Sequence, residues 1–127
     1  MTESQFQQWL EDYLRPQEQR TADRIKELFT ENGVYHWGPF QETRFGINAI
    51  YEHHRNALSR QDDIHYDYQI LAVTETFGIA HFHLTIREIQ EARHDEYDGI
   101  FKVHLDRTGR CTLFEEWYHS RLAPNPG

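Results

Sequence analysis

Residues 77–91 read FGIAHFHLTIREIQE and residues 96–106 read EYDGIFKVHLD, and these two stretches decide the fold. In both, apolar side chains alternate with polar ones, which is typical of a β-strand with one buried face. The apolar face holds Ala80, Phe82, Leu84 and Ile86 from the first stretch and Gly99, Phe101, Val103 and Leu105 from the second. The opposite face holds His81, His83, Thr85, Arg87, Asp98, Ile100, Lys102 and His104. The alternation predicts two long strands of one sheet.

Two further stretches extend this sheet on either side. Residues 64–74 and 110–120 are rich in the β-branched and aromatic residues that favour strands. Asp106-Arg107-Thr108-Gly109 is a suitable hairpin loop between the last two strands. The second half of the chain is therefore predicted to be an antiparallel sheet of four long strands.

The first half of the chain shows helical spacing. Thr2 or Ser4 can cap a helix, Pro16 is expected to end or offset it, and a second helix is expected over residues 17–29. The apolar positions of the first helix recur at i, i+3, i+4, i+7 and i+8, and they are Phe6, Trp9, Leu10, Tyr13 and Leu14.

A short strand and a third helix are expected next. The turn Glu31-Asn32-Gly33 should end the second helix, with Gly33 in a left-handed conformation, and residues 34–37 should form the strand. Gly38-Pro39-Phe40 reads as a turn, and a third helix begins at Gly46. Its apolar stripe is Ile47, Ile50, Tyr51, His54 and Leu58. Helices followed by an antiparallel sheet indicate an α+β fold.

Composition limits the class of protein. The 127 residues allow one domain, with a core over about 6–121 and a loose tail over 122–127. The net charge of −8 argues against nucleic acid and anionic membranes as partners. A single cysteine, Cys111, excludes an internal disulfide, and neither a signal peptide nor an apolar membrane span is visible. We therefore expect a cytoplasmic protein.

Five short motifs carry a family resemblance. They are ELFTENGVY at 27–35, GPF at 38–40, GINAI at 46–50, DRTGRC at 106–111 and FEEWY at 114–118. Their order and spacing resemble the nuclear transport factor 2-like superfamily, in its SnoaL-like and ketosteroid-isomerase-like branch. The resemblance implies a cone-shaped antiparallel sheet that, with three N-terminal helices, encloses a pocket. Cyclases, dehydratases, epoxide hydrolases and members without known activity share this fold, so the fold does not define a reaction.

Alignment with ketosteroid isomerase implies that its chemistry is absent. The general-base aspartate of that enzyme falls on Trp37 or Gly38, neither of which accepts a proton. Its protonated aspartate falls on Phe101, while its oxyanion-hole tyrosine is matched by Tyr13. Two of the three defining groups are therefore missing.

The same alignment implies which polar groups face the pocket. His54 falls on a second pocket tyrosine, and Tyr118 falls on a pocket tryptophan, which places Glu116 on the inward face two residues earlier. We predict that His54 and Glu116 lie within direct or one-water reach of each other, with Tyr13 able to stabilise an oxyanion. The aromatic pocket walls are predicted to be Trp9, Tyr35, Trp37, Phe40, Phe82, Phe101 and Tyr118.

Alternatives remain open for these groups. His54 and Glu116 can form an acid–base couple, or they can simply satisfy one another or the backbone beneath the helices. Tyr13, Trp9 and Trp37 can equally be core residues. His81 and His83 could chelate a metal, but no ligand set is complete, so no metal or cofactor is expected.

Three functions fit the sequence. The first is an enzyme without a cofactor, a lyase, isomerase, cyclase or hydrolase, that transfers protons on an apolar cyclic or aromatic substrate. The second is a protein that binds such a molecule without turnover. The third is a dimeric scaffold, because a sheet face that carries Ile100, Trp117, His81, His83 and His104 is suited to forming a homodimer.

Overall fold

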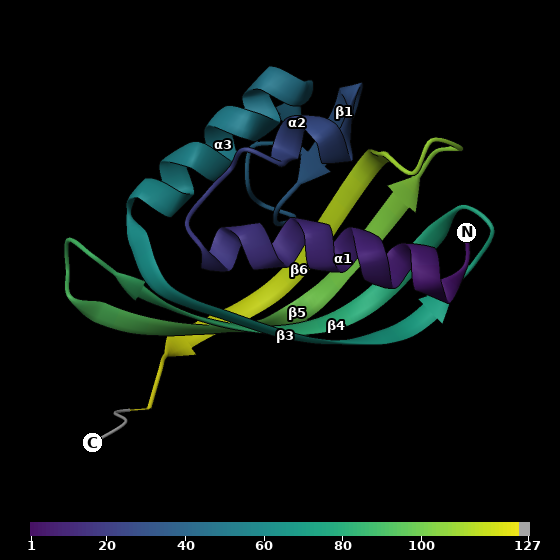
Figure 1. The fold of residues 1–127 in the computed structure, drawn as a ribbon. Coiled ribbons are helices and arrows are strands. Elements are labelled where there is room, and N and C mark those ends of the chain that lie inside the picture. Colours follow the sequence, from purple (N-terminus) through teal and green to yellow (C-terminus); the bar gives the residue numbers. More distant parts are fainter. Residues whose placement is uncertain (125–127) are drawn as a thin grey trace.

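The computed structural model describes residues 1–124 as an α+β protein (Figure 1). Six strands form one sheet in the order β2-β1-β6-β5-β4-β3. The elements are α1 (Glu3–Glu18), α2 (Ile25–Leu28), β1 (Phe29–His36), β2 (Arg44–Phe45), α3 (Ile47–Ser59), β3 (Gln61–Val73), β4 (Phe77–Glu88), β5 (Arg93–Leu105) and β6 (Cys111–Leu122). This arrangement confirms the predicted fold class.

Helix α1 begins at a capping box and buries the predicted face. The Thr2 side chain accepts a hydrogen bond from the Gln5 amide, and the Gln5 side chain accepts one from the Thr2 amide. Phe6, Trp9, Leu10, Tyr13 and Leu14 are all buried. The prediction that Pro16 ends the helix is wrong, since the helix continues to Glu18. A carboxylate oxygen of Glu18 accepts a hydrogen bond from the Tyr66 amide at 2.8 Å, which holds this last turn against β3.

The predicted second helix over 17–29 is much shorter in the structure. Residues 17 and 18 belong to α1, and only Ile25–Leu28 form a second helix, because Arg20 adopts a positive φ of 61° and Phe29 already starts β1. The expected turn at Glu31–Gly33 lies inside β1, and Gly33 does not have a positive φ. A Cβ on Gly33 would lie 3.1 Å from the Thr30 carbonyl oxygen. A side chain at this position would therefore crowd the backbone at the irregular part of the β1–β6 pairing.

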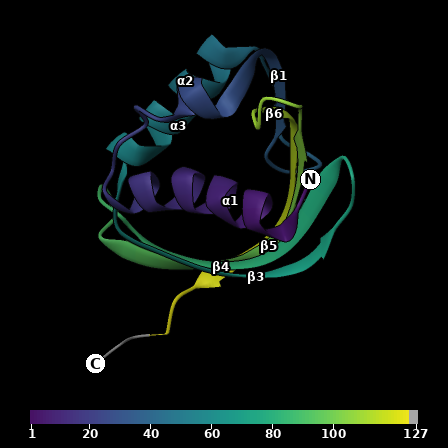
Figure 2. The same ribbon diagram turned by 45° about the vertical axis from the view of Figure 1, so that its right-hand side comes forward.

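The sheet curves around α1. Figure 2 shows the long strands β3 to β6 bending beneath this helix, while α3 and α2 lie at the far side. Every strand pair is antiparallel except β1 with β6, which run parallel from Phe29 opposite Cys111 to His36 opposite Glu115. No helix in residues 1–124 is long and apolar enough to cross a membrane.

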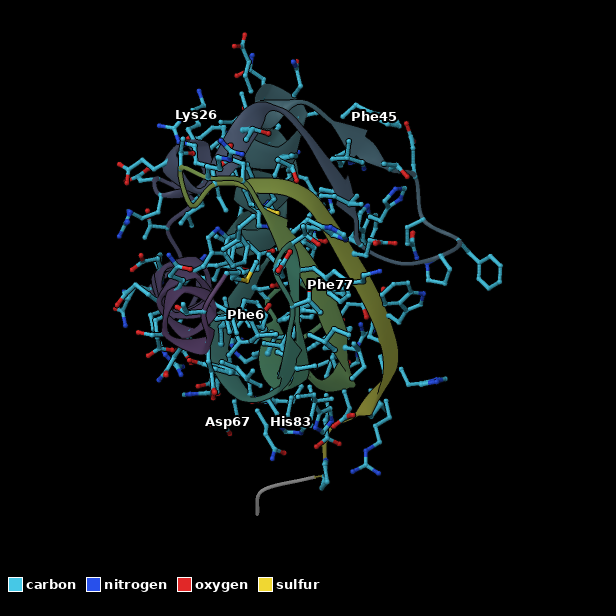
Figure 3. The ribbon with its side chains drawn as sticks, turned by 90° about the vertical axis from the view of Figure 1, so that its right-hand side faces the viewer. Phe6, Lys26, Phe45, Asp67, Phe77 and His83 are labelled. Carbon is cyan, nitrogen blue, oxygen red and sulfur yellow. The ribbon has the colours of Figure 1, made fainter. Side chains whose placement is uncertain are left out.

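Strand alternation places the two faces as predicted. Phe82 and Phe101 share the inner face, and their rings stack with centroids 4.0 Å apart. Figure 3 shows Phe6 between α1 and the sheet, while His83 points away from the opposite, outer face. The predicted tail begins later than expected, because Leu122 still belongs to β6; residues 125–127 lie outside the described part of the chain.

Candidate functional site

A chain of hydrogen bonds under the helices joins three predicted site residues. Nε2 of His54 lies 2.8 Å from the Tyr13 hydroxyl, which lies 3.4 Å from the Tyr35 hydroxyl. Nδ1 of His54 lies 2.8 Å from the Ile50 carbonyl oxygen one turn earlier in α3. Because a carbonyl only accepts, Nδ1 carries the proton, and Nε2 accepts from Tyr13. Tyr35 then donates to Tyr13, so the direction of the whole chain is fixed.

His54 is a neutral member of this chain. Burial lowers its pKa to about 4, while the hydrogen bond to Ile50 opposes that shift. Burial also raises the pKa of Tyr13 and of Tyr35 well above the ordinary tyrosine value. None of the three residues therefore ionises near neutral pH.

Glu116 lies on the inner face of β6, and its carboxyl group has no hydrogen-bond partner within residues 1–124. Desolvation raises the pKa of its carboxyl group to about 8. Its side chain is nevertheless partly exposed. Within residues 1–124, Nε2 of His104 is the only side-chain nitrogen or oxygen that is both buried and without a hydrogen-bond partner, so the unpartnered Glu116 oxygens are not buried. The Glu116 oxygens therefore reach open space, although protein surrounds the side chain.

The structure does not pair His54 with Glu116 directly. Both ring nitrogens of His54 are occupied, by Tyr13 and by Ile50, and the Glu116 carboxyl binds neither of them. The relation of Glu116 to the hydrogen-bonded chain is electrostatic, because its negative charge would raise the pKa of Tyr13 and of Tyr35 further. Of the predicted direct or one-water contact, the direct form is absent, because His54 pairs with Tyr13 instead.

Three tyrosines continue the inner face beyond Glu116. Tyr66, Tyr97 and Tyr118 are all partly exposed, and the rings of Tyr97 and Tyr118 lie 5.5 Å apart. Their hydroxyl groups have no hydrogen-bond partner in the described residues, and none of them is sealed from water. Burial, followed by the charge of Glu116, raises the pKa of Tyr118, and both effects also act on Tyr66. The charge of Glu116 therefore acts on Tyr13, Tyr35, Tyr66 and Tyr118.

The remaining predicted walls divide between core and rim. Trp9 is core, since it is buried, stacks on Tyr13 at 4.9 Å and donates from Nε1 to the Leu28 carbonyl. Phe82 and Phe101 form the closed floor beside Glu116. The prediction for Phe40 is wrong, because its side chain is 99% exposed at the tip of the turn after β1.

Trp37 lies at the rim and introduces a residue that the sequence analysis missed. Its ring lies 4.6 Å from that of His53, and its Nε1 donates to the Glu42 carbonyl at 2.9 Å. Burial lowers the pKa of His53 to about 3, and the neighbouring His54 and Arg44 lower it further. His53 falls beside the apolar stripe of α3, so helical spacing gave no reason to select it. The short strand β2, which brings Arg44 to it, was also not predicted.

The outer face and a surface hollow beside α1 lie apart from these residues. His81 pairs with Asp98 at 2.8 Å and His83 with Glu96 at 2.7 Å, both across β4 and β5. Within residues 1–124, no group of three or more potential ligands is arranged to hold a metal ion. A hollow of about 930 Å³ lies between α1, α2 and the two loops at 75–76 and 106–110. Of the predicted site residues only Trp9 borders it.

Comparisons with known proteins assign the family. The chain belongs to the SnoaL-like domain family, which matches residues 10–114. No curated protein sequence matches the chain.

Solved structures confirm the nuclear transport factor 2-like fold. The chain is similar to the epoxide hydrolase/cyclase-like enzyme SalBIII, which acts in pyran ring formation in the polyether salinomycin, with a TM-score of 0.83 and 14% identity over 97% of this chain and 100% of that one. It also resembles an LEH-like epoxide hydrolase of M. tuberculosis (TM-score 0.77, 12% identity, 91% and 84% covered). A third neighbour is a nuclear transport factor 2-like protein of unknown function from Exiguobacterium sp. 255-15 (TM-score 0.74, 16% identity, 87% and 98% covered).

Proposed function

We propose that the chain is a cofactor-free enzyme that transfers a proton from Glu116 to an apolar small molecule bound against the inner face of the sheet. One observation carries the proposal. A carboxyl group surrounded by protein, with no partner of its own, reaches open space among tyrosines. A pKa near 8 keeps this group protonated at neutral pH, as a general acid requires. A carboxyl group with only a structural role would be expected to have a hydrogen-bond partner.

The reaction class that suits a lone acid is the opening of a strained carbon–oxygen bond. Glu116 gives its proton to the ring oxygen of an epoxide while the carbon–oxygen bond breaks. The oxygen of water, or of a hydroxyl group on the same substrate, forms the new bond to carbon. The proton that this nucleophile loses restores the Glu116 carboxyl group. Two of the similar structures are an epoxide hydrolase and an epoxide hydrolase/cyclase-like enzyme, which supports this choice.

In this proposal, Tyr13 and His54 act as positioning residues. The Tyr13 hydroxyl donates its hydrogen bond to His54, so it has no free donor for an oxyanion. The series of hydrogen bonds from Tyr35 through Tyr13 and His54 to the Ile50 carbonyl fixes uncharged rings beside Glu116 and does not involve its carboxyl group. Phe82 and Phe101 provide the floor, and Trp37, Tyr35 and Tyr118 provide the walls of the proposed pocket.

Exchanging the proposed acid tests the function, and the adjacent residue supplies a control. Glu116→Gln keeps the size and the neutral charge of the group but has no acidic proton to give. Glu115 lies next to it on the outer face, 3.9 Å from His104, so Glu115→Gln changes the same residue type outside the site. We expect hydrolysis of an apolar epoxide such as styrene oxide to fall about 10²–10⁴-fold in Glu116→Gln only. Equal rates in both variants would exclude Glu116 as the acid.

A ligand-binding protein without turnover is the second candidate. It is favoured by the closed hydrogen-bond chain, in which Tyr13 and His54 already satisfy each other. In that case, wild type and Glu116→Gln should bind the same ligands and neither should convert them, as mass spectrometry of the incubated mixture would show.

We further propose that the chain forms a homodimer through its outer sheet face and works in the cytoplasm, in keeping with the free, buried thiol of Cys111. Trp117 is 43% exposed at the centre of that face. Light scattering should report a dimer for wild type and a monomer for Trp117→Lys. A monomeric wild type would contradict the proposal. Fractionation of cells should recover the chain in the cytoplasm, and recovery from a secreted or membrane fraction would contradict the location.

A further inference from the structure

Within residues 1–124, the inner face around Glu116 is lined by side chains that carry no formal charge at neutral pH. Each packed element contributes an uncharged group at neutral pH. These groups are Tyr13 from α1, Tyr35 and Trp37 from β1, His53 and His54 from α3, Tyr66 from β3, Leu84 from β4, Phe101 and Tyr97 from β5, and Glu116 itself with Tyr118 from β6.

Most formal charges near these groups are paired within residues 1–124, but Arg60, whose charge adds to the effect of burial on the pKa of His53, has no ion-pair partner there. Asp95, buried at the end of the same face of β5, is held by Arg93 through two hydrogen bonds of 2.8 and 3.0 Å. Glu18, beneath Tyr66, pairs with Arg15 at 3.0 Å. Arg44 faces the Trp37 ring and lies 3.7 Å from Glu42. Burial is the cause of the raised pKa of Glu116, and no cation acts on this carboxyl group to lower it, so a ligand at Glu116 finds no cation beside it to pair with a negative charge.

From this arrangement we propose that the site selects uncharged ligands whose oxygen accepts a hydrogen bond from Glu116, such as ethers, epoxides and ketones. The site excludes carboxylates. This inference rests on the site described in the proposed function. The inference concerns binding, so it holds whether or not the ligand is converted.

The physical reason lies in the balance of desolvation and pairing. A carboxylate that enters this face loses water and gains no cation, which is unfavourable. A ketone or ether oxygen loses little and gains the one free donor at the floor, the Glu116 O–H. The hydroxyl groups of Tyr66, Tyr97 and Tyr118 supply further free donors near the opening for a ligand with a second oxygen.

An ammonium ligand is the competing occupant, because aromatic rings around an ionised carboxylate suit a cation. The two occupants require opposite protonation states of Glu116. An oxygen acceptor requires the protonated carboxyl group and binds less well as pH rises, whereas an ammonium group requires the carboxylate and binds better. Near a pKa of about 8, the direction of the pH dependence decides between them.

Three probes of similar size test the inference on the full chain: acetophenone, benzoate and benzylammonium. Dissociation constants are measured by titration of the protein amide NMR signals at pH 6.5 and pH 9, for wild type and Glu116→Gln. We expect acetophenone to bind wild type about tenfold less tightly at pH 9, as the carboxyl group loses its proton. In Glu116→Gln, whose amide stays neutral, its affinity should be the same at both values.

Benzoate should bind at least about tenfold more weakly than acetophenone at pH 6.5 in both proteins. Benzoate binding equal to that of acetophenone would overturn the inference, as would failure of all three probes to bind. Benzylammonium that binds wild type more tightly at pH 9 than acetophenone does at pH 6.5 would assign the site to cations instead. If acetophenone behaves as expected but no epoxide is opened, the proposed function fails while the ligand selection stands.

Discussion

The inner face of the sheet is apolar and closed to water at one end, and polar and partly exposed at the other. At the closed end Phe6, Phe82, Phe101, Phe114 and Val103 are at most 1% exposed and carry no polar side-chain atom. At the open end the same strands present Tyr97, Tyr118 and Glu116, all partly exposed, with Tyr66 beside them. Along β6 the change takes place within five residues, from Phe114 through Glu116 to Tyr118.

The comparison shows how one sheet face supplies both stability and a site. Phenylalanine fills the part that no water reaches, since it buries a large apolar area without a polar group to satisfy. Tyrosine and the carboxyl group appear where the interior becomes reachable, because water or a ligand can complete their hydrogen bonds. The side chains of the closed end therefore contribute mainly to stability, and those of the open end mainly to the candidate site. Substitutions at the two ends should have correspondingly different effects.

The largest effect is expected at the closed end. Phe101→Ala removes the ring that stacks on Phe82 and leaves a cavity, which should lower the free energy of unfolding by about 3–5 kcal/mol. Tyr118→Phe at the open end removes only an unpartnered hydroxyl group and should change it by less than about 0.5 kcal/mol. Urea denaturation measures both. A Tyr118→Phe loss as large as that of Phe101→Ala would remove the distinction between the ends.

The next effect is a pH dependence that Glu116 imposes. Its folded pKa of about 8 lies above the ordinary value of 4.5, so the unfolded chain gives up this proton first as pH rises. Stability is therefore complete below about pH 4.5 and decreases as pH rises towards 8. We expect Glu116→Gln to be more stable than wild type at pH 9, by about 3 kcal/mol at most because the carboxyl group reaches water, and equal to it at pH 4.5.

Melting temperatures of both proteins and of Glu115→Gln at pH 4.5 and 9 provide this comparison. Glu115→Gln should follow wild type at both pH values, since its carboxyl group lies on the outer face. Wild type that loses no stability relative to Glu116→Gln would show that Glu116 ionises freely in the folded protein.

The smallest effect is expected between the two ends, at His54. His54→Phe keeps a ring but leaves the Tyr13 hydroxyl without its acceptor, which should cost about 1–2 kcal/mol. The folded pKa of His54 lies near 4, below its ordinary 6.5, so wild type should also lose stability as pH falls from 6.5 to 4. Urea denaturation at pH 7 and 5 should show a smaller acid loss in the variant. An unchanged acid loss would mean that His54 takes up a proton in the folded state.

The elements that the sequence predicted well are those with a strict local period. Alternation in β4 and β5 correctly placed Phe82 and Phe101 on one face, and helical spacing gave the buried face of α1. The error at 17–29 arose because a helical composition was overridden by a distant partner, β6, which draws residues 29–36 into the sheet. No local pattern carries that parallel pairing.

The site shows the same limit. The inward position of Glu116 followed from strand parity, and its neighbourhood with Tyr13 followed from the family alignment. The absence of a hydrogen bond between Glu116 and His54 could not be predicted in this way. It arises because Nδ1 of His54 donates to the carbonyl of Ile50, only four residues away. Local backbone acceptors compete with distant side chains, and the spacing of residues does not reveal the outcome.

The parallel pairing of β1 with β6 has a consequence for the order in which the protein forms. Phe29 and Cys111 face each other across 82 positions of the chain, and Tyr35 faces Phe114. Contacts of such long sequence separation are slow to form, because closing the intervening loop loses entropy before any contact repays it. During synthesis, β1 emerges from the ribosome long before β6 does, and until then it can pair only with the short strand β2. Glu116 and two of its aromatic neighbours, Phe114 and Tyr118, lie on that last strand, so a nascent chain lacks the proposed site until β6 is in place.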